Sequence, residues 1–198
     1  MPARESLLDA AGAALARRPW SRVRMVDVAA GAGFSRQTLY NEFGSKEGLA
    51  RALLRRETDG YLRGVDRALA QEREPAERLA AVAAWTVGAA RANALVRAAL
   101  TGCWSERLPV PSRVAGSTSS VLAQRRADAG TPSSAELLGL VRDRAVAALG
   151  GRGRDPELAL ACESALRLAL SYIVAPARDD DDPAELVRGA IGRWVAGR

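Results

Sequence analysis

Side chains that can recognise DNA are concentrated in one short stretch, Met25 to Lys46, which reads MVDVAAGAGFSRQTLYNEFGSK. Five of them fall between positions 36 and 41: Arg36, Gln37, Thr38, Tyr40 and Asn41. Side chains of these types donate hydrogen bonds to base edges in the major groove and to backbone phosphates. The chemistry that this stretch indicates is the reading of double-stranded DNA.

The residues around these donors have the spacing of a helix-turn-helix. Two short helices that cross steeply need a small side chain where they touch, and Ala29 stands at that place. The turn needs a residue that tolerates positive φ, which is Gly33, and Ser35 is placed to cap the second helix. The apolar residues expected between the helices are Val28, Phe34 and Leu39. The alternative is an ordinary helical hairpin with a polar outer face, which does not require these donors.

The charge of the chain is concentrated in the same region. The formal net charge is +6, and residues 17 to 56 hold nine basic and three acidic side chains, a surplus as large as that of the whole chain. Such a surplus fits phosphate binding. The alternative is an arginine-rich composition spread over solvated faces. Lys46 is the only lysine and stands at the expected start of a helix, where a phosphate is also attracted.

The composition argues against several classes of protein. The chain has no histidine, so histidine-dependent triads and zinc sites with imidazole ligands are impossible. Cys103 and Cys162 are the only cysteines, and no glycine-rich nucleotide motif or G-x-S-x-G string occurs. No secretory stretch or apolar run of about 18 residues is present. We therefore expect a cytoplasmic protein that is not an enzyme, needs no cofactor or metal, and does not enter a membrane.

Hydrophobic periodicity predicts helices throughout the chain. The segments with helical spacing are 3–18, 45–70, 76–100, 119–129, 134–148, 156–175 and 183–197, and a further helical stretch includes Leu100, Cys103 and Trp104. Residues 109–120 have the composition of a loop that either borders a pocket or simply connects two helices. Asp155 and Asp182 each precede a proline and are expected to cap helices, so we interpret the acidic run 179–182 as a helix start and not as a metal site.

The order D-V-A-x-x-A-G-F-S-R-Q-T-L-Y-x-x-F-x-S-K-x-x-L resembles the N-terminal domain of the TetR family of bacterial repressors, over about residues 4 to 56. The resemblance implies an all-α fold, with a three-helix DNA-binding domain at 1–47 and a helical ligand-binding and dimerisation domain at 48–198, linked by helix 45–70. It also implies that Arg36, Gln37 and Asn41 face bases, and that Thr38, Tyr40 and Lys46 lie mainly on phosphates.

The sequence departs from the family pattern at Arg24, and at Asn41 and Glu42, where many members carry aromatic or basic residues. Arg24 replaces the usual Ser or Thr cap of the first motif helix, although its guanidinium can still reach a phosphate. Glu42 would repel phosphate, so we expect it to face away from DNA or to pair with an arginine. With Ser35, the predicted DNA-binding set is Arg24, Ser35, Arg36, Gln37, Thr38, Tyr40, Asn41 and Lys46.

The function that we expect is that of a homodimeric repressor, which binds a palindromic operator and leaves it when a small lipophilic molecule binds the second domain. The predicted pocket residues are Trp85, Asn93, Cys103, Trp104 and Tyr172, although residues of these types are more often plain core. The predicted dimer interface comprises Leu166, Leu170, Ile173, Leu186, Ile191 and Trp194, from two largely apolar helices. The alternatives are a ligand-independent regulator, a helical scaffold with a basic face, and an enzyme that uses carboxylates or Cys103.

Overall fold

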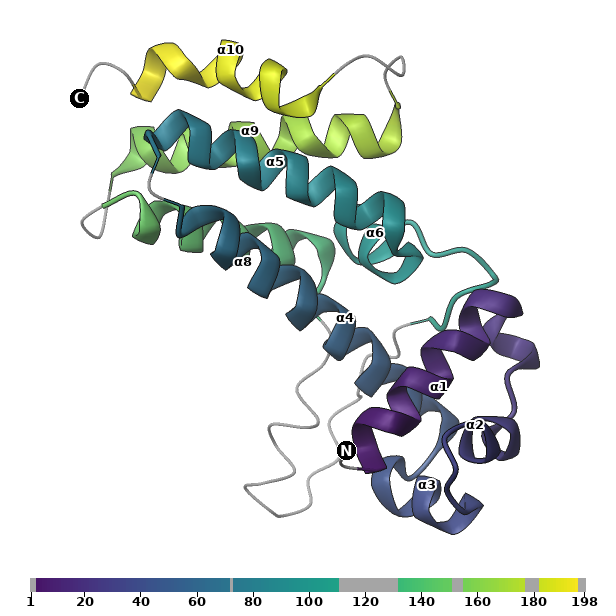
Figure 1. Ribbon diagram of the computed structural model, residues 1–198. Helices are drawn as coiled ribbons and strands as arrows, with labels where there is room; N and C mark the ends of the chain where they lie inside the picture. The colour runs from purple at the N-terminus through teal and green to yellow at the C-terminus, as the bar shows by residue number, and fades with distance from the viewer. Residues whose placement is uncertain (1–2, 72, 111–131, 151–154, 177–181, 196–198) are drawn as a thin grey trace. The chain divides into compact units, whose positions relative to one another are not determined.

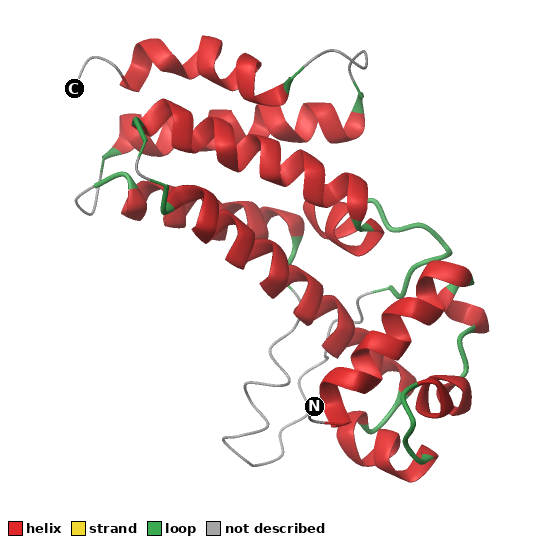
Figure 2. Cartoon of the chain, in the orientation of Figure 1, coloured by secondary structure: helices red, strands yellow, loops and turns green. Residues whose placement is uncertain are grey.

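The computed structural model describes residues 3–71, 73–110, 132–150, 155–176 and 182–195, with side chains to 191. Every regular element in these ranges is a helix (Figures 1 and 2). The elements are α1 (Ala3–Arg17), the 3-10 helix η1 (Trp20–Arg22), α2 (Met25–Gly31), α3 (Arg36–Phe43), α4 (Lys46–Leu69), α5 (Pro75–Ala92), α6 (Ala94–Thr101), α8 (Ser134–Ala148), α9 (Pro156–Val174) and α10 (Pro183–Val195). The prediction of an all-α fold is confirmed.

The chain forms two compact units that share α4. The first contains the residues up to Glu57 and the segment 104–110, and the second contains the described residues of 58–103 and 132–198. The predicted domain boundary after residue 47 falls earlier in the same helix. The segment 104–110 joins the first unit through a 2.8 Å hydrogen bond from the backbone N–H of Trp20 to the carbonyl of Arg107.

The first unit is a three-helix cluster closed by the first turns of α4. Helices α1, α2 and α3 pack against one another around side chains that are at most 1% exposed. These side chains are Leu7, Val28, Leu39, Leu49 and Leu53. Burial of each such side chain stabilises the unit by about 2 kcal/mol, so the short helices α2 and α3 are held by packing more than by helix propensity.

The second unit is a helical bundle in which α5 packs against both α9 and α10, and α8 packs against α6 and α9. Its most deeply buried residues include Leu79, Val82, Val87, Leu100, Leu137 and Val141. The predicted caps are confirmed, since Asp155 accepts a hydrogen bond from the backbone N–H of Leu158 at 3.0 Å and Asp182 accepts one from that of Ala184 at 2.9 Å. Residues 179–181 lie outside the described part of the chain.

The helix predicted over 76–100 is two helices. Asn93 separates them, because its side-chain oxygen accepts hydrogen bonds from the backbone N–H groups of Leu95 (2.9 Å) and Val96 (3.4 Å) and so caps α6. The further helical stretch was predicted correctly for Leu100 but wrongly for Cys103 and Trp104, since α6 ends at Thr101 and Gly102 adopts a φ of 73°. The helix predicted over 119–129 lies outside the described residues.

No described helix is both long enough and apolar enough to cross a lipid bilayer.

Candidate DNA-binding surface

The turn between α2 and α3 has the predicted geometry. Gly33 adopts a φ of 75°, and the backbone N–H of Phe34 donates to the carbonyl of Ala29 at 2.9 Å. Ala29 is 2% exposed at the contact between the helices. A Cβ on Gly33 would meet no atom within 4 Å, so glycine is required here by the backbone conformation and not by lack of space.

Ser35 fixes the start of α3. Its side-chain oxygen accepts a hydrogen bond of 3.0 Å from the backbone N–H of Thr38 and lies 2.9 Å from the Thr38 hydroxyl. The N-terminus of α2 has no side-chain cap, as the presence of Arg24 predicted. Arg24 instead lies 3.5 Å from the Asp27 carboxylate, which also accepts a 3.1 Å hydrogen bond from Arg18.

Helix α3 divides cleanly into a buried and an exposed face. Leu39 and Phe43 are buried, whereas Arg36, Gln37 and Asn41 are exposed. Thr38 and Tyr40 are half-buried at the edge of the exposed face. Two contacts organise this face: a 2.8 Å hydrogen bond from the Gln37 amide to the Asn41 side-chain oxygen, and the placement of the Arg36 guanidinium 5.1 Å from the centre of the Tyr40 ring.

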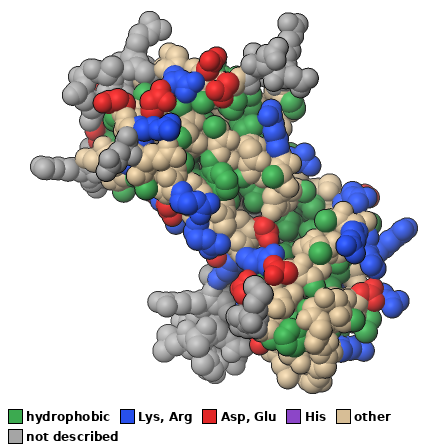
Figure 3. All heavy atoms as spheres, in the orientation of Figure 1, with side chains coloured by type: hydrophobic (Ala, Val, Ile, Leu, Met, Phe, Trp, Pro, Cys, Tyr) green, Lys and Arg blue, Asp and Glu red, His purple; other side chains and the backbone are tan. Residues whose placement is uncertain are grey.

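Glu42 is paired as predicted. Its carboxylate lies 3.7 Å from the guanidinium of Arg4, which comes from the first turn of α1. Several basic residues of the region are also engaged in ion pairs, among them Arg18 with Asp27 and Arg56 with Asp9 at 2.7 Å. Basic side chains are interspersed with acidic ones on the face seen in Figure 3. Part of the positive charge of residues 17–56 is therefore neutralised by carboxylates of the same unit.

Lys46 lies at the start of α4 and contacts η1. Its ammonium group donates to the carbonyl of Ser21 at 3.2 Å and lies 5.6 Å from the centre of the Trp20 ring. Ser45 caps the helix by accepting a 3.0 Å hydrogen bond from the backbone N–H of Gly48. The pKa of Glu47 is lowered, first by its own backbone N–H and then by the Ser45 hydroxyl, so a carboxylate and an ammonium stand side by side at this helix start.

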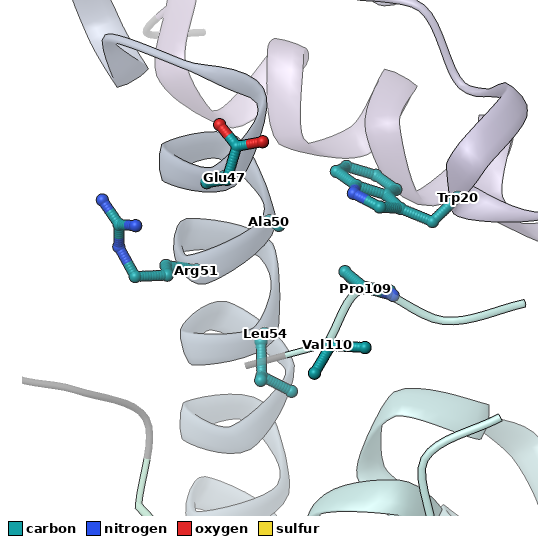
Figure 4. A pocket seen from close by; sticks show the side chains of 7 residues that line it. All are labelled: Trp20, Glu47, Ala50, Arg51, Leu54, Pro109 and Val110. Atoms are coloured by element: carbon teal, nitrogen blue, oxygen red, sulfur yellow. The ribbon is translucent and has the colours of Figure 1, made fainter. Parts of the chain in front are cut away.

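A cavity of about 170 Å³ lies beside Trp20 in the same unit (Figure 4). Its lining residues come from η1, from α4 and from the segment 104–110: Trp20, Glu47, Ala50, Arg51, Leu54, Pro109 and Val110. Pro109 and Val110 belong to the loop for which one prediction was that it borders a pocket, but nothing in the composition of residues 104–110 indicates that they return to the first unit.

The predicted ligand-binding residues do not belong to one unit, since Trp104 lies in the first and the other four in the second. The Asn93 side-chain oxygen caps α6, and the indole N–H of Trp85 donates to the carbonyl of Tyr61 at 3.0 Å. Cys103 is exposed and Tyr172 is half-buried. A cavity of about 240 Å³ between α8 and α9 is lined by other residues: Ser134, Ala135, Leu138, Gly139, Arg142, Glu163, Leu166 and Arg167.

The predicted interface residues differ in exposure. Leu166 and Ile191 are each only 3% exposed and so pack within the protomer. Leu170 and Ile173 are half-buried, Leu186 is 41% exposed, and the Trp194 side chain lies outside the described residues. The exposed apolar residues that sequence reasoning missed on α9 are Leu160 and Val174. A helix that is apolar nearly all round does not reveal from its sequence which face the core covers.

Comparison with known proteins gives a family match inside the first unit. The model of the family described as bacterial regulatory proteins, tetR family, matches residues 7–53. The HTH-type transcriptional regulator AlkX of Mycobacterium tuberculosis is 47% identical over 66 residues, which are 33% of this chain and 31% of that protein. An uncharacterised HTH-type regulator of the same species is 35% identical over 114 residues, 58% of this chain and 55% of that protein. The chain thus matches only a third to about half of these relatives.

Solved structures match over nearly the whole length. The TetR family repressor AlkX from Dietzia covers 98% of this chain and 96% of its own, with a TM-score of 0.58 and 21% identity. A TetR/AcrR family regulator from Thermobifida fusca covers 98% and 97%, with a TM-score of 0.57 and 17% identity. At these identities the likeness is one of fold. Residues 7–53 thus match the tetR family of bacterial regulatory proteins, and the chain shares the all-helical fold of solved TetR family structures.

Proposed function

We propose that the chain is a DNA-binding transcriptional regulator, a repressor that binds a palindromic operator as a homodimer and leaves it when a small lipophilic molecule binds the second unit. The observation that carries the proposal is the exposed face of α3. Arg36, Gln37 and Asn41 project from a helix whose start is capped by Ser35 and whose opposite face is buried. A rigid helix with exposed donors of these types is suited to the major groove.

Two copies of α3 are needed to read a palindrome, because each helix reads only one half-site. The half-sites of such operators lie about 34 to 36 Å apart, one turn of the duplex. Exposed apolar side chains on α9 and α10, namely Leu160, Val174 and Leu186, support an interface between copies of the chain at these helices. Leu186 belongs to the predicted interface, whereas the protomer itself covers Leu166 and Ile191.

Release by a ligand requires that the ligand prefers one spacing of the two reading helices over another. The ligand lowers DNA affinity only by the ratio of its affinities for the two states. The two units share α4, and the first unit also contains the segment 104–110 that follows α6, so the chain passes between the units more than once. A ligand that changes the second unit can therefore act on the first through these connecting segments of the chain.

The test compares the full chain on a selected duplex and on random duplexes of the same length, by fluorescence anisotropy at physiological salt. A specific regulator prefers its operator by at least about a thousandfold. Equal binding to all duplexes favours the competing function, a helical scaffold with a basic face that binds acidic partners. A panel of apolar compounds added to the bound complex then tests release, and retention with every compound favours a ligand-independent regulator.

A further inference from the structure

Three contacts of one side chain converge on the C-terminal end of α3. The guanidinium of Arg4 donates a 3.2 Å hydrogen bond to the backbone carbonyl of Glu42 and lies 3.7 Å from the carboxylate of the same residue. It also lies 4.7 Å from the centre of the Phe43 ring. Arg4 belongs to α1 and lies 38 positions before Glu42 in the chain, so these contacts tie α1 to α3.

Each contact supplies α3 with a stabilising interaction that the helix does not make within itself. The last carbonyls of a helix lack partners within it and carry partial negative charge, which a cation stabilises. Glu42 is the only acidic residue of α3, and its charge would oppose the approach of a phosphate. Phe43 is 9% exposed and anchors the end of the helix in the core, so a guanidinium stacked on its ring fixes the position of that end.

We infer that Arg4 is a positioning residue for DNA recognition: it caps α3 from outside, holds its C-terminal end in register, and neutralises Glu42 on the face that meets the duplex. The inference rests on the proposed DNA binding. This role differs from direct binding of a phosphate, because a guanidinium that contacts Glu42 and Phe43 affects DNA binding through the position of α3. The loss of Arg4 should therefore cost more affinity when Glu42 is charged than when it is neutral.

The experiment is a double-mutant cycle on binding to the selected duplex, with Arg4→Ala, Glu42→Gln and the double variant. Arg4→Ala leaves Glu42 uncompensated and should weaken binding about tenfold. Glu42→Gln in that background should restore affinity to within about threefold of the wild type, a larger gain than the same change gives alone. Arg4→Lys keeps the positive charge but lacks a planar group to stack on Phe43. Its affinity should therefore lie between that of Arg4→Ala and that of the wild type. Arg97→Ala, an exposed arginine on α6, is the matched charge control and should bind as the wild type does.

The salt dependence of binding separates positioning from direct contact. The double variant has the same net charge as the wild type and should keep its salt slope. Loss of a direct phosphate contact would instead make the slope shallower by about one per subunit. An equal gain from Glu42→Gln with and without Arg4, or a shallower slope in the double variant, overturns the inference. Equal binding of all duplexes by the wild type is a different result, because it removes the proposed function itself.

Discussion

The side-chain amide of Gln37 donates a 2.8 Å hydrogen bond to the side-chain oxygen of Asn41, one turn further along α3. Both side chains are exposed, so the bond orients, before DNA is present, two groups that we propose to read bases. Ordering them in advance lowers the entropy cost of binding. The two residues are therefore expected to act as one reading unit, which Arg36 extends along the same face.

Gln37→Ala should relax the base preference at one position of each half-site and cost about 1–3 kcal/mol on the preferred sequence. Asn41→Ala should affect the same or the adjacent position, and the double variant should lose less than the sum of the two, because each single change already breaks the bonded pair. The measurement is selection from duplexes randomised at each position. An unchanged base preference in Gln37→Ala would show that this residue does not face a base.

Lys46→Ala should weaken binding to every duplex alike and make the salt slope shallower by about one per subunit. Its ammonium group uses one donor on the Ser21 carbonyl and keeps two for a phosphate. Binding titrations at several salt concentrations measure the slope, with Lys46→Arg as the variant that retains the charge. A loss confined to one sequence would contradict a phosphate contact.

Gly64→Ala should destabilise the second unit by about 3 kcal/mol or more, because the added Cβ would overlap the indole ring of Trp85. Gly88 in α5 is the matched control, since a Cβ there meets no atom within 4 Å. Gly88→Ala should raise stability by up to about 1 kcal/mol through helix propensity. Chemical denaturation of both variants measures the difference, and equal stabilities would disprove the close packing of α4 on α5.

Much of this architecture follows from local sequence rules. Gly33, Ser35, Asp155 and Asp182 were predicted from the short-range geometry of turns and caps, and each has its predicted position. Asn93 was not anticipated as a cap, because the alanine-rich residues on either side are themselves strong helix formers. The pattern of such a run does not indicate that a side chain in its middle ends one helix and caps the next.

Contacts between segments that are far apart in the sequence could not be predicted from the sequence. The sequence predicts that Glu42 faces away from DNA or pairs with an arginine, but the partner that it has, Arg4, lies on another helix and carries no local signal. The notch at Gly64 that admits Trp85 is likewise a meeting of two helices. The same limit explains the interface residues, since the choice between the core face and the exposed face of α9 depends on where α5 and α8 pack.

The protein should become less stable in alkaline solution, because the Cys162 thiol and the Tyr61 phenol ionise less readily in the folded chain than in the unfolded one. Burial raises the pKa of Cys162 from 9.0 to about 12, and burial raises that of Tyr61 from 10.0 to about 12 although Thr86 lies within hydrogen-bond distance. Between the unfolded and folded pKa values the unfolded chain has lost a proton that the folded chain keeps. The free energy of unfolding should therefore fall by about 1.4 kcal/mol per pH unit for each group, from pH 9 for the thiol and from pH 10 for the phenol.

Urea denaturation at a series of pH values from 8 upward measures this fall. The variant that carries Cys162→Ala and Tyr61→Phe should show a flatter dependence than the wild type, and Cys103→Ala, which changes the exposed cysteine, should not. Parallel curves for the double variant and the wild type would show that neither group is responsible.

Leu186→Glu should shift the chain from dimer to monomer and weaken operator binding together, because a carboxylate cannot be buried in an apolar interface without a large cost. Leu140→Glu on α8 is the matched control, since both leucines are 41% exposed in the protomer. Sedimentation velocity over a range of concentrations measures the change. Equal dissociation caused by both substitutions would place the interface elsewhere.

The most direct test of the account is selection of bound sequences from a pool of random duplexes with the full chain. A dimer whose two copies of α3 read successive major grooves should enrich one palindrome, with half-site centres about 10 base pairs apart. The same palindrome should lose its advantage over random DNA when Gln37 and Asn41 are both replaced by alanine. Recovery of unrelated sequences with no shared half-site, at equal affinity, would contradict the account.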